Sequence, residues 1–271
     1  KRAWLPGMCS GTIIGAIAMT EPSAGSDLAN IKTSAKQNKD KFLINGQKTF
    51  ISNGHISDLV ITACKTTPDV GAKGISLLVV LRDDEGFSRG RNLEKIGWHA
   101  QDTAELFYSD VEVTVDRMIG EENKGFTYLM QELAQERLIV AIRAATTIEA
   151  ALEETIKYTK GREAFGKPLF SFQNTRFKLA EAKTNATVVR SFIDQCTSLH
   201  MTQSLDANDA AMAKLFATET MCKVLDDCLQ MYGGYGYMWE YPIARMWAGQ
   251  RIARIAGGSS EIMKEIISRT L

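Results

Sequence analysis

The sequence has 271 residues, of which 45% are hydrophobic, and its 32 Lys and Arg residues balance 32 Asp and Glu residues. A chain of this length and composition can bury a large core in one or two domains. Its zero net charge gives no sign of a nucleic-acid or anionic membrane partner. No apolar run approaches the about 20 residues needed to cross a bilayer, so we do not expect an integral membrane protein.

The cysteines and histidines do not form a recognisable metal site. The five cysteines contain no C-x-x-C pair, and the three histidines are scattered. This usage favours a reducing compartment and no metal chemistry. The chain starts at Lys1 without an initiator Met or the features of a signal peptide, so we expect it to begin inside a longer protein.

Residues 1–120 have the pattern of a β domain. Short apolar or β-branched runs alternate with turn signals such as Asn45-Gly46 and Asn53-Gly54. Strands at this spacing, without helical periodicity between them, predict a small antiparallel β-barrel or sandwich. The expected strands are 13–20, 42–44, 59–64, 75–81 and 104–113.

Residues 121–271 have helical periodicity, because apolar residues recur every three or four positions. Long helices with short connections predict an antiparallel four-helix bundle. The fold class expected for the whole chain is therefore α+β, with a β domain at 1–120 and a helical domain at 121–271. The expected helices are 124–160, 172–200, 206–231, 241–250 and 259–271.

Glu136 lies in the first long helix and is a candidate general base. Four apolar residues share its helical face in this pattern, so we expect the carboxylate to face the core. Apolar neighbours disfavour the charged form and raise the pKa of a carboxyl group toward the range useful for a base. A solvated ion pair with Arg137 is the alternative. The four apolar residues are Leu129, Leu133, Ile139 and Val140.

Two stretches of the β domain could bind a polar or flat ligand. The turn Thr20–Asp27 follows a strand and contains Gly25 and hydroxyl groups, so its backbone N–H groups could approach a ligand closely. Phe50 and Ser52 share one face of a strand, so a heterocycle could stack on the ring while the hydroxyl binds its edge. In isolation, an ordinary turn and a β-hairpin arm are the better explanations of these two stretches.

Two stretches of the helical domain are also candidates. Arg162, in Gly161–Gly166, could pair with a phosphate, or it could be a favourable cation at a helix C-terminus. The glycine-rich stretch Gln230–Tyr237 is not a P-loop, because no GK[ST] follows it. It is not a dinucleotide fingerprint either, because no strand precedes it.

Taken in order, five stretches resemble motifs of the acyl-CoA dehydrogenase family of flavoenzymes, and the resemblance covers essentially all of 1–271. It implies a middle β-domain followed by a C-terminal four-helix domain, with the family's N-terminal helical domain absent from this chain. The five stretches are 18–27, 48–54, 162–167, 230–236 and 257–262.

The resemblance implies an FAD site. The strand and turn from Ile17 to Ser26 would hold FAD, and 50–52 would line the flavin ring, where the family often has Trp in place of Phe50. Arg162, Gln173 and 230–234 would bind the FAD of a neighbouring subunit. The implied cofactor residues are Ile17, Met19, Thr20, Gly25, Ser26, Phe50, Ile51, Ser52, Arg162, Gln173, Gln230, Met231, Gly233, Gly234, Ser259, Ser260 and Glu261.

One departure from the family pattern concerns the catalytic base. Many members carry the base at the position of Gly257, which has no side chain to abstract a proton. A minority, similar to long-chain and isovaleryl-CoA dehydrogenases, carry it on the long helix at the position of Glu136. The resemblance therefore implies that Glu136 is the base, while the backbone N–H of Gly257 binds the thioester oxygen.

The implied reaction is FAD-dependent conversion of an acyl-CoA, most similar to the long-chain type, into a trans-2-enoyl-CoA. The alternatives are an isovaleryl or other short branched substrate, a catalytically inactive flavin-binding assembly protein, and an oxidase. If the family resemblance is set aside, the alternative is a helical adaptor protein with a β-domain, which would bind no chromophore. The implied substrate contacts are Ser26, Ala72, Lys73, Ala134, Gln135, Arg137, Gly257 and Gly258.

The resemblance also implies a homotetramer that passes electrons to electron-transfer flavoprotein. The mitochondrial matrix and the bacterial cytoplasm are equally compatible locations.

Overall fold

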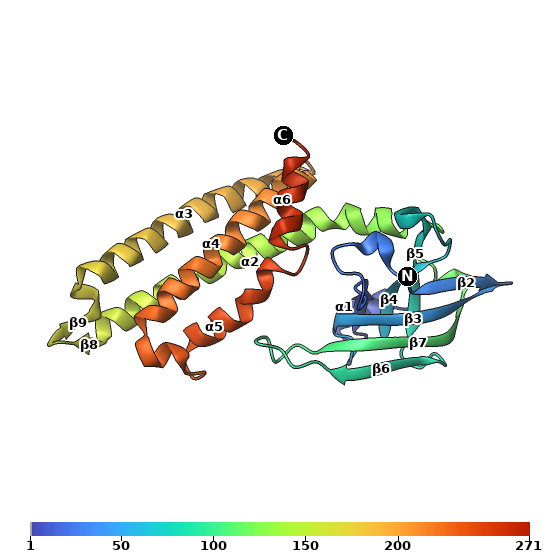
Figure 1. Cartoon of the computed structure of the whole chain (residues 1–271), viewed down its shortest axis with the longest axis horizontal. Coiled ribbons are helices and arrows are strands. Elements are labelled where there is room, and N and C mark those ends of the chain that lie inside the picture. The colour runs from blue at the N-terminus through green and yellow to red at the C-terminus, as the bar shows by residue number, and fades with distance from the viewer. Residues whose placement is uncertain (1) are drawn as a thin grey trace. The chain divides into compact units, whose positions relative to one another are not determined.

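A computed structural model describes residues 2–271, which form two compact units that divide between Gln131 and Glu132. The first unit is built on a sheet and the second on helices, so the α+β class expected from the sequence is confirmed (Figure 1). The domain limits 1–120 and 121–271 stay a prediction. Across residues 2–271, no helix is both long and apolar enough to cross a membrane.

The described part of the first unit contains a seven-stranded sheet in the order β1-β4-β2-β3-β7-β6, with β5 also pairing with β4. Most neighbours are antiparallel, as expected, but β4 pairs in parallel with both β1 and β2. The strands are β1 (Gly15–Ala18), β2 (Ser34–Asn38), β3 (Lys41–Ser52), β4 (Leu59–Lys65), β5 (Ile75–Leu81), β6 (Phe87–Asn92) and β7 (Thr103–Thr114).

Strands β2 and β6 and the short helix α1 (Leu5–Ser10) were not expected from the sequence. Both strands are mostly polar, and neither carries an alternation of buried residues that a pattern could reveal. Three 3₁₀ turns complete the unit. They are η1 (Leu28–Asn30), η2 (Gly71–Gly74) and η3 (Val115–Arg117).

The turn expected at Asn45-Gly46 is wrong, because both residues lie inside the 12-residue strand β3. The register with β7 shifts between Ile44 and Gly46, which marks a β-bulge. Gly46 has φ of 150°, and a Cβ on it would stand 2.7 Å from the Cα of Thr33. The glycine is therefore required by a close backbone approach, and the strand continues through it.

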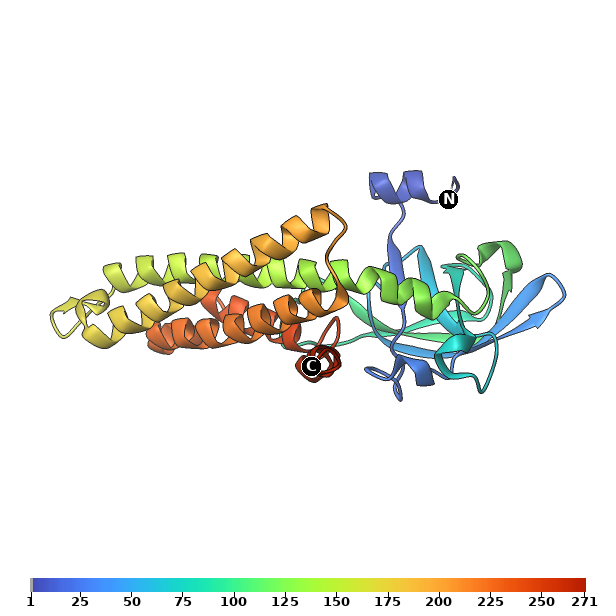
Figure 2. The same cartoon turned by 90° about the horizontal axis from the view of Figure 1, so that it is seen from above.

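The second unit is built of helices (Figure 2), and their bounds agree with the sequence expectation to within a few residues. A small hairpin, β8 (Glu163–Ala164) with β9 (Lys167–Pro168), and turn η4 (Leu169–Ser171) connect the first two long helices. The helices are α2 (Gly125–Gly161), which begins in the first unit, α3 (Gln173–Met201), α4 (Ala207–Met231), α5 (Pro242–Gln250) and α6 (Ser260–Ser268). Turns η5 (Gly233–Tyr237) and η6 (Arg251–Arg254) flank α5.

Small residues dominate the core between these helices. In α2 the buried stripe includes Ala141, Ala145, Ile148 and Leu152, which recur at helical spacing. Alanines on α3 and α4 face the same core, so the helix backbones can approach closely. The Asp206 carboxylate caps the N-terminus of α4 by accepting a hydrogen bond from the Asp209 N–H.

Candidate active site

The expected burial of Glu136 in the helical core is wrong. Glu136 is exposed, and Ile139, which should share its buried face, is 56% exposed. The buried stripe of α2 instead passes through Arg137, Leu138 and Ala141. Glu136 lies beside this stripe, at a position where a ligand can reach its carboxylate.

The pKa of Glu136 is nevertheless raised above its ordinary value. Partial desolvation is the largest cause, and the carboxylate of Glu132 four residues earlier adds a like charge on the same side of the helix. The neighbouring Arg137 guanidinium opposes this rise. A carboxyl group with a raised pKa is a better proton acceptor than an ordinary one.

Gly257 lies against the helical turn that follows Glu136. A Cβ at Gly257 would stand 4.0 Å from Cγ2 of Val140, which is four residues after Glu136 and therefore on the same side of α2. The backbone is left-handed at Gly257, with φ of 69°, and at Gly258, with φ of 98°. The structure thus places Gly257 against the turn of α2 that follows Glu136, although the two predicted catalytic residues are far apart in the sequence.

A buried lysine, Lys214 on α4, holds this glycine pair. Its Nζ donates a hydrogen bond of 2.6 Å to the carbonyl oxygen of Gly258. Desolvation, followed by the positive charge of Arg137, lowers the pKa of Lys214 to about 8, although Glu219 and Glu261 act in the opposite direction. Arg137 is also buried, and its Nε has no hydrogen-bond partner within the described residues.

A second residue on α4, Glu219, anchors the chain after the glycines. Its Oε1 accepts a hydrogen bond of 2.5 Å from Ser260 Oγ, and its carboxylate forms an ion pair of 2.7 Å with Arg254. Ser259 caps α6 by accepting a hydrogen bond from the Ile262 N–H, and Glu261 is exposed. These contacts fix the run 257–261 on both sides.

Sequence reasoning missed Lys214 and Glu219. The available signal was a lysine at a core position of an apolar helix, since Ala210, Ala217 and Met221 recur around Lys214 at helical spacing and are buried. A lysine on such a face is fully buried only when its charge has a partner.

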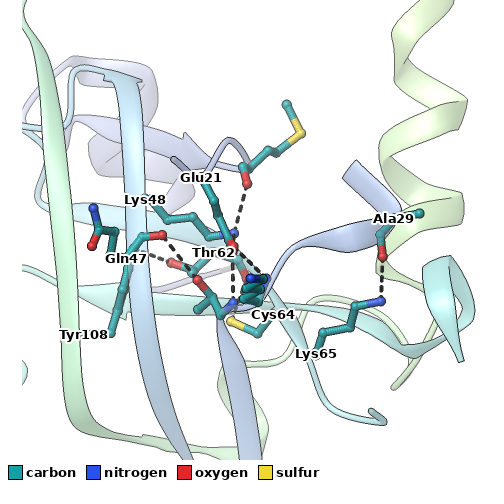
Figure 3. Close-up of polar contacts among 11 residues, drawn as sticks. Glu21, Ala29, Gln47, Lys48, Thr62, Cys64, Lys65 and Tyr108 are labelled. Atoms are coloured by element: carbon teal, nitrogen blue, oxygen red, sulfur yellow. Dashed lines mark hydrogen bonds and ion pairs between the residues drawn. The ribbon is translucent and has the colours of Figure 1, made fainter. Parts of the chain in front are cut away.

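In the first unit, the turn after β1 is fastened to β3. The Thr49 N–H donates to the Thr20 carbonyl over 2.9 Å, and Lys48 Nζ reaches Met19 O and Glu21 Oε1, each at 2.9 Å (Figure 3). These contacts connect the segment predicted to hold FAD, 17–26, with the strand that carries 50–52, which is predicted to line the flavin ring.

The exposed side chains along these segments fit a flat, largely apolar group. Phe50 is 68% exposed and Ile17 is 40% exposed, although both lie in ordered strands. Ser52 is exposed like Phe50, whereas the side chain of Ile51 between them is buried in the sheet core. An isoalloxazine ring could cover the exposed ring and hydroxyl, while Ile51 could contribute through its backbone only.

The predicted CoA contacts of the β domain lie at a second group of turns. Ala72 and Lys73 are on η2, and Ser26 is exposed two residues before η1. Lys65 Nζ connects these turns by donating to Ala29 O over 2.8 Å (Figure 3) and to Gly71 O. In the second unit, Gln135 is exposed and Ala134 is half-buried next to Glu136.

Arg162 and the glycine-rich stretch share a cavity of about 560 Å³. Its walls include Gln230, Met231, Gly233 and Gly234, and the Arg162 guanidinium lies 5.5 Å from the centre of the Tyr235 ring. The Arg162 guanidinium and the left-handed backbone of Gly233 both line this cavity, and this combination suits a ligand that carries a phosphate. Gln173, at the start of α3, is exposed and does not line this cavity.

Comparison with known proteins identifies the family. Residues 123–271 match the model described as "Acyl-CoA dehydrogenase, C-terminal domain", and residues 16–111 match "Acyl-CoA dehydrogenase, middle domain". A long-chain specific acyl-CoA dehydrogenase from Mus musculus is 50% identical over 270 residues, which cover 99% of this chain and 63% of the relative. An acyl-CoA dehydrogenase from Bacillus subtilis is 38% identical and is covered to 72%.

A solved structure described as an acyl-CoA dehydrogenase from Geobacillus kaustophilus has a TM-score of 0.98 and 50% identity. The match covers all of this chain and 72% of that one. The chain thus spans only part of the length of its relatives, which agrees with the two matched domains. Members of the family are FAD-dependent flavoproteins. The chain belongs to the acyl-CoA dehydrogenase family, of which it carries the middle and C-terminal domains.

Proposed function

We propose that the protein containing this chain catalyses FAD-dependent α,β-dehydrogenation of an acyl-CoA, with Glu136 as the base. The observation that carries the proposal is the approach of Gly257, which has no side chain, to the turn of α2 that follows Glu136. The family position occupied by Gly257 cannot accept a proton, and Glu136 is the carboxylate within one helical turn of the Val140 contact.

In the proposed step, Glu136 removes the α-proton of the acyl thioester, and its raised pKa favours accepting that proton. Bound FAD would accept the β-hydrogen as a hydride, which leaves a trans-2 double bond in the product. The Gly257 N–H donates to the thioester oxygen, where negative charge develops. A donor in such a position contributes roughly 3–4 kcal/mol to stabilisation of the transition state.

The surrounding charges support this assignment. Arg137 and Lys214 are both buried and positively charged near the glycine pair, whereas the Glu219 carboxylate is already paired with Arg254. Excess positive charge in a poorly solvated site stabilises a developing enolate.

We propose a long-chain acyl-CoA as the substrate, because the relative at 50% identity is specific for long chains. The alternative is isovaleryl-CoA or another short branched acyl-CoA, since the absence of a side chain at Gly257 leaves room near the thioester. We further propose electron-transfer flavoprotein as the electron acceptor and a homotetramer as the assembly. The location is the mitochondrial matrix or a bacterial cytoplasm.

The test is anaerobic reduction of the flavin by palmitoyl-CoA in the full-length protein. The wild type should lose its flavin absorbance, while Glu136→Gln, which keeps the shape of the side chain, should lose it at least 1000-fold more slowly. Glu153→Gln, an exposed position farther along α2, is the control and should behave as the wild type. Equal reduction in wild type and Glu136→Gln would refute Glu136 as the base.

A second candidate is a catalytically inactive flavin-binding assembly protein. The exposure of Glu136 favours it, because a solvated carboxylate beside Gly257 would leave the site without a base. This candidate predicts a yellow protein that neither palmitoyl-CoA nor isovaleryl-CoA reduces. Reduction by isovaleryl-CoA alone would instead identify the branched-chain substrate.

A further inference from the structure

A buried ion pair connects the two segments of the first unit that we assign to the flavin. The Lys48 side chain is wholly buried, and its Nζ donates to Glu21 Oε1 and to the Met19 carbonyl, each over 2.9 Å. The same carboxylate accepts hydrogen bonds from the Lys32 N–H at 2.6 Å and the Thr33 N–H at 2.9 Å. The Glu21 carboxylate therefore connects its own turn with two other stretches of chain, residues 32–33 and strand β3 at Lys48 (Figure 3).

A buried ion pair is not the interaction expected if its only role is to stabilise the fold. Replacing a buried ion pair by apolar residues of similar size is often neutral or stabilising, so such a pair is weak evidence for stability. Thr20 lies in the sequence between Met19 and Glu21, the two residues whose oxygens accept hydrogen bonds from Lys48. The carbonyl oxygen of Thr20 accepts a hydrogen bond of 2.9 Å from the Thr49 N–H. The Thr20 hydroxyl has no hydrogen-bond partner within the described residues.

The ion pair lies two residues before the exposed aromatic ring of Phe50. Lys48, Thr49 and Phe50 are consecutive, and the first two are bonded to the turn after β1. Phe50 has a left-handed backbone with φ of 59°, at an irregularity in the pairing of β3 with β7. Backbone strain of this kind persists only where the surrounding contacts impose it.

We propose that Glu21 and Lys48 are positioning residues for the cofactor, which hold the Thr20 turn and the Phe50 ring in the arrangement that binds the flavin ring. This inference rests on the proposed function. The pair does not touch the cofactor; it acts through Thr20 and Phe50, so that less ordering is left to occur when FAD binds.

The decisive experiment compares FAD affinity with thermal stability in the full-length protein. The apoprotein is titrated with FAD for the wild type, Lys48→Met, Glu21→Gln and the double variant, and the melting temperature of each is measured. The matched control is Asp84→Asn, which breaks the ion pair of Asp84 with Arg117 at 2.7 Å in the same unit, outside the flavin segments. We expect both single variants to bind FAD at least 10-fold more weakly and the control to stay within twofold of the wild type.

The double variant separates positioning from stability. It leaves no unpaired buried charge, so its melting temperature should recover relative to the single variants, while its FAD affinity should remain at least 10-fold weakened. Recovery of both quantities together, or an equal loss of affinity in Asp84→Asn, would show that the pair is only structural and would overturn the inference.

The variant Phe50→Ala distinguishes this failure from failure of the proposed function. If Phe50→Ala weakens FAD binding but the Glu21 and Lys48 variants do not, the flavin site is correct and the positioning role is wrong. If the wild-type protein binds no FAD, the proposed function itself fails.

Discussion

Lys214 Nζ donates its hydrogen bond to the Gly258 carbonyl over 2.6 Å while the whole lysine side chain is buried. A buried ammonium bonded to one neutral oxygen is incompletely compensated, and Arg137 adds a second positive charge nearby. The loop that carries the Gly257 N–H is therefore held by a group that destabilises the folded state at neutral pH. Such a cost is expected where a charge serves the chemistry of a site.

This contact predicts a specific dependence of stability on pH. The pKa of Lys214 is about 8 in the folded protein, compared with an ordinary value of 10.5. Between these values the unfolded chain keeps a proton that the folded chain releases, so the free energy of unfolding rises with pH. Relative to Lys214→Met, wild-type stability should increase by roughly 3 kcal/mol across this window. Urea unfolding at a series of pH values would measure it, and parallel curves for the two proteins would contradict it.

The acid limb of the activity profile should respond to Glu132. The pKa of Glu136 is raised in part by the Glu132 carboxylate, so the base becomes protonated, and inactive, at a higher pH than an ordinary glutamate. Glu132→Gln removes this like charge and should move the acid limb of kcat/KM toward lower pH. Measurements of kcat/KM against pH for the wild type, Glu132→Gln and Glu153→Gln would test this. A limb that shifts equally in both variants would exclude the direct electrostatic effect.

The two glycines of the oxyanion loop should differ in their tolerance of alanine. At Gly257 a Cβ would meet only Cγ2 of Val140, at an ordinary contact distance of 4.0 Å, so Gly257→Ala suffers mainly from its left-handed backbone, at a cost of about 1 kcal/mol. At Gly258 the Cβ would also meet Cε of Met263 at 2.7 Å. Gly258→Ala should therefore lose more stability, about 2 kcal/mol. Chemical denaturation measures both, and equal losses would show that the methionine moves aside freely.

The bulge in β3 makes a prediction for the sheet. A Cβ at Gly46 would stand 2.5 Å from Oγ1 and 2.7 Å from Cα of Thr33, and the latter is backbone that cannot move without disturbing β2. Gly46→Ala should destabilise the protein by about 2 kcal/mol or more. Gly71→Ala is a useful comparison, because Gly71 has a left-handed backbone but open space around its Cβ. A loss at Gly46 no larger than that at Gly71 would refute the steric explanation.

The helices were predictable because their signal is local: apolar residues recur at helical spacing over 20 residues or more in each long helix. The direction in which Glu136 points was not. Leu129 packs in a core of the first unit, whereas Leu138 and Ala141 belong to the core of the second. The apolar residues along this part of α2 therefore pack into two different cores, so their spacing does not define a single buried face of the helix.

The sheet was predictable only where its strands are apolar. Asn45-Gly46 has the residues of a tight turn, but a bulge uses the same glycine conformational freedom inside a strand. Local sequence does not distinguish the two, because the difference lies in the approach of Thr33, the residue that precedes β2. The role of Lys214 was missed for a related reason: its partner is the backbone carbonyl of Gly258, which is far along the chain and has no side chain in the pattern.

The length of α2 determines how many FAD molecules one chain contacts under the proposed function. Arg162 directly follows this helix and lies 26 residues beyond Glu136. At the rise of an α-helix, this separates them by about 39 Å, which a flavin and an adenine joined by one pyrophosphate do not bridge. Under the proposed function, the cavity at Arg162 and the base at Glu136 serve two different FAD molecules. Each chain would then act as a rigid spacer between two reaction centres.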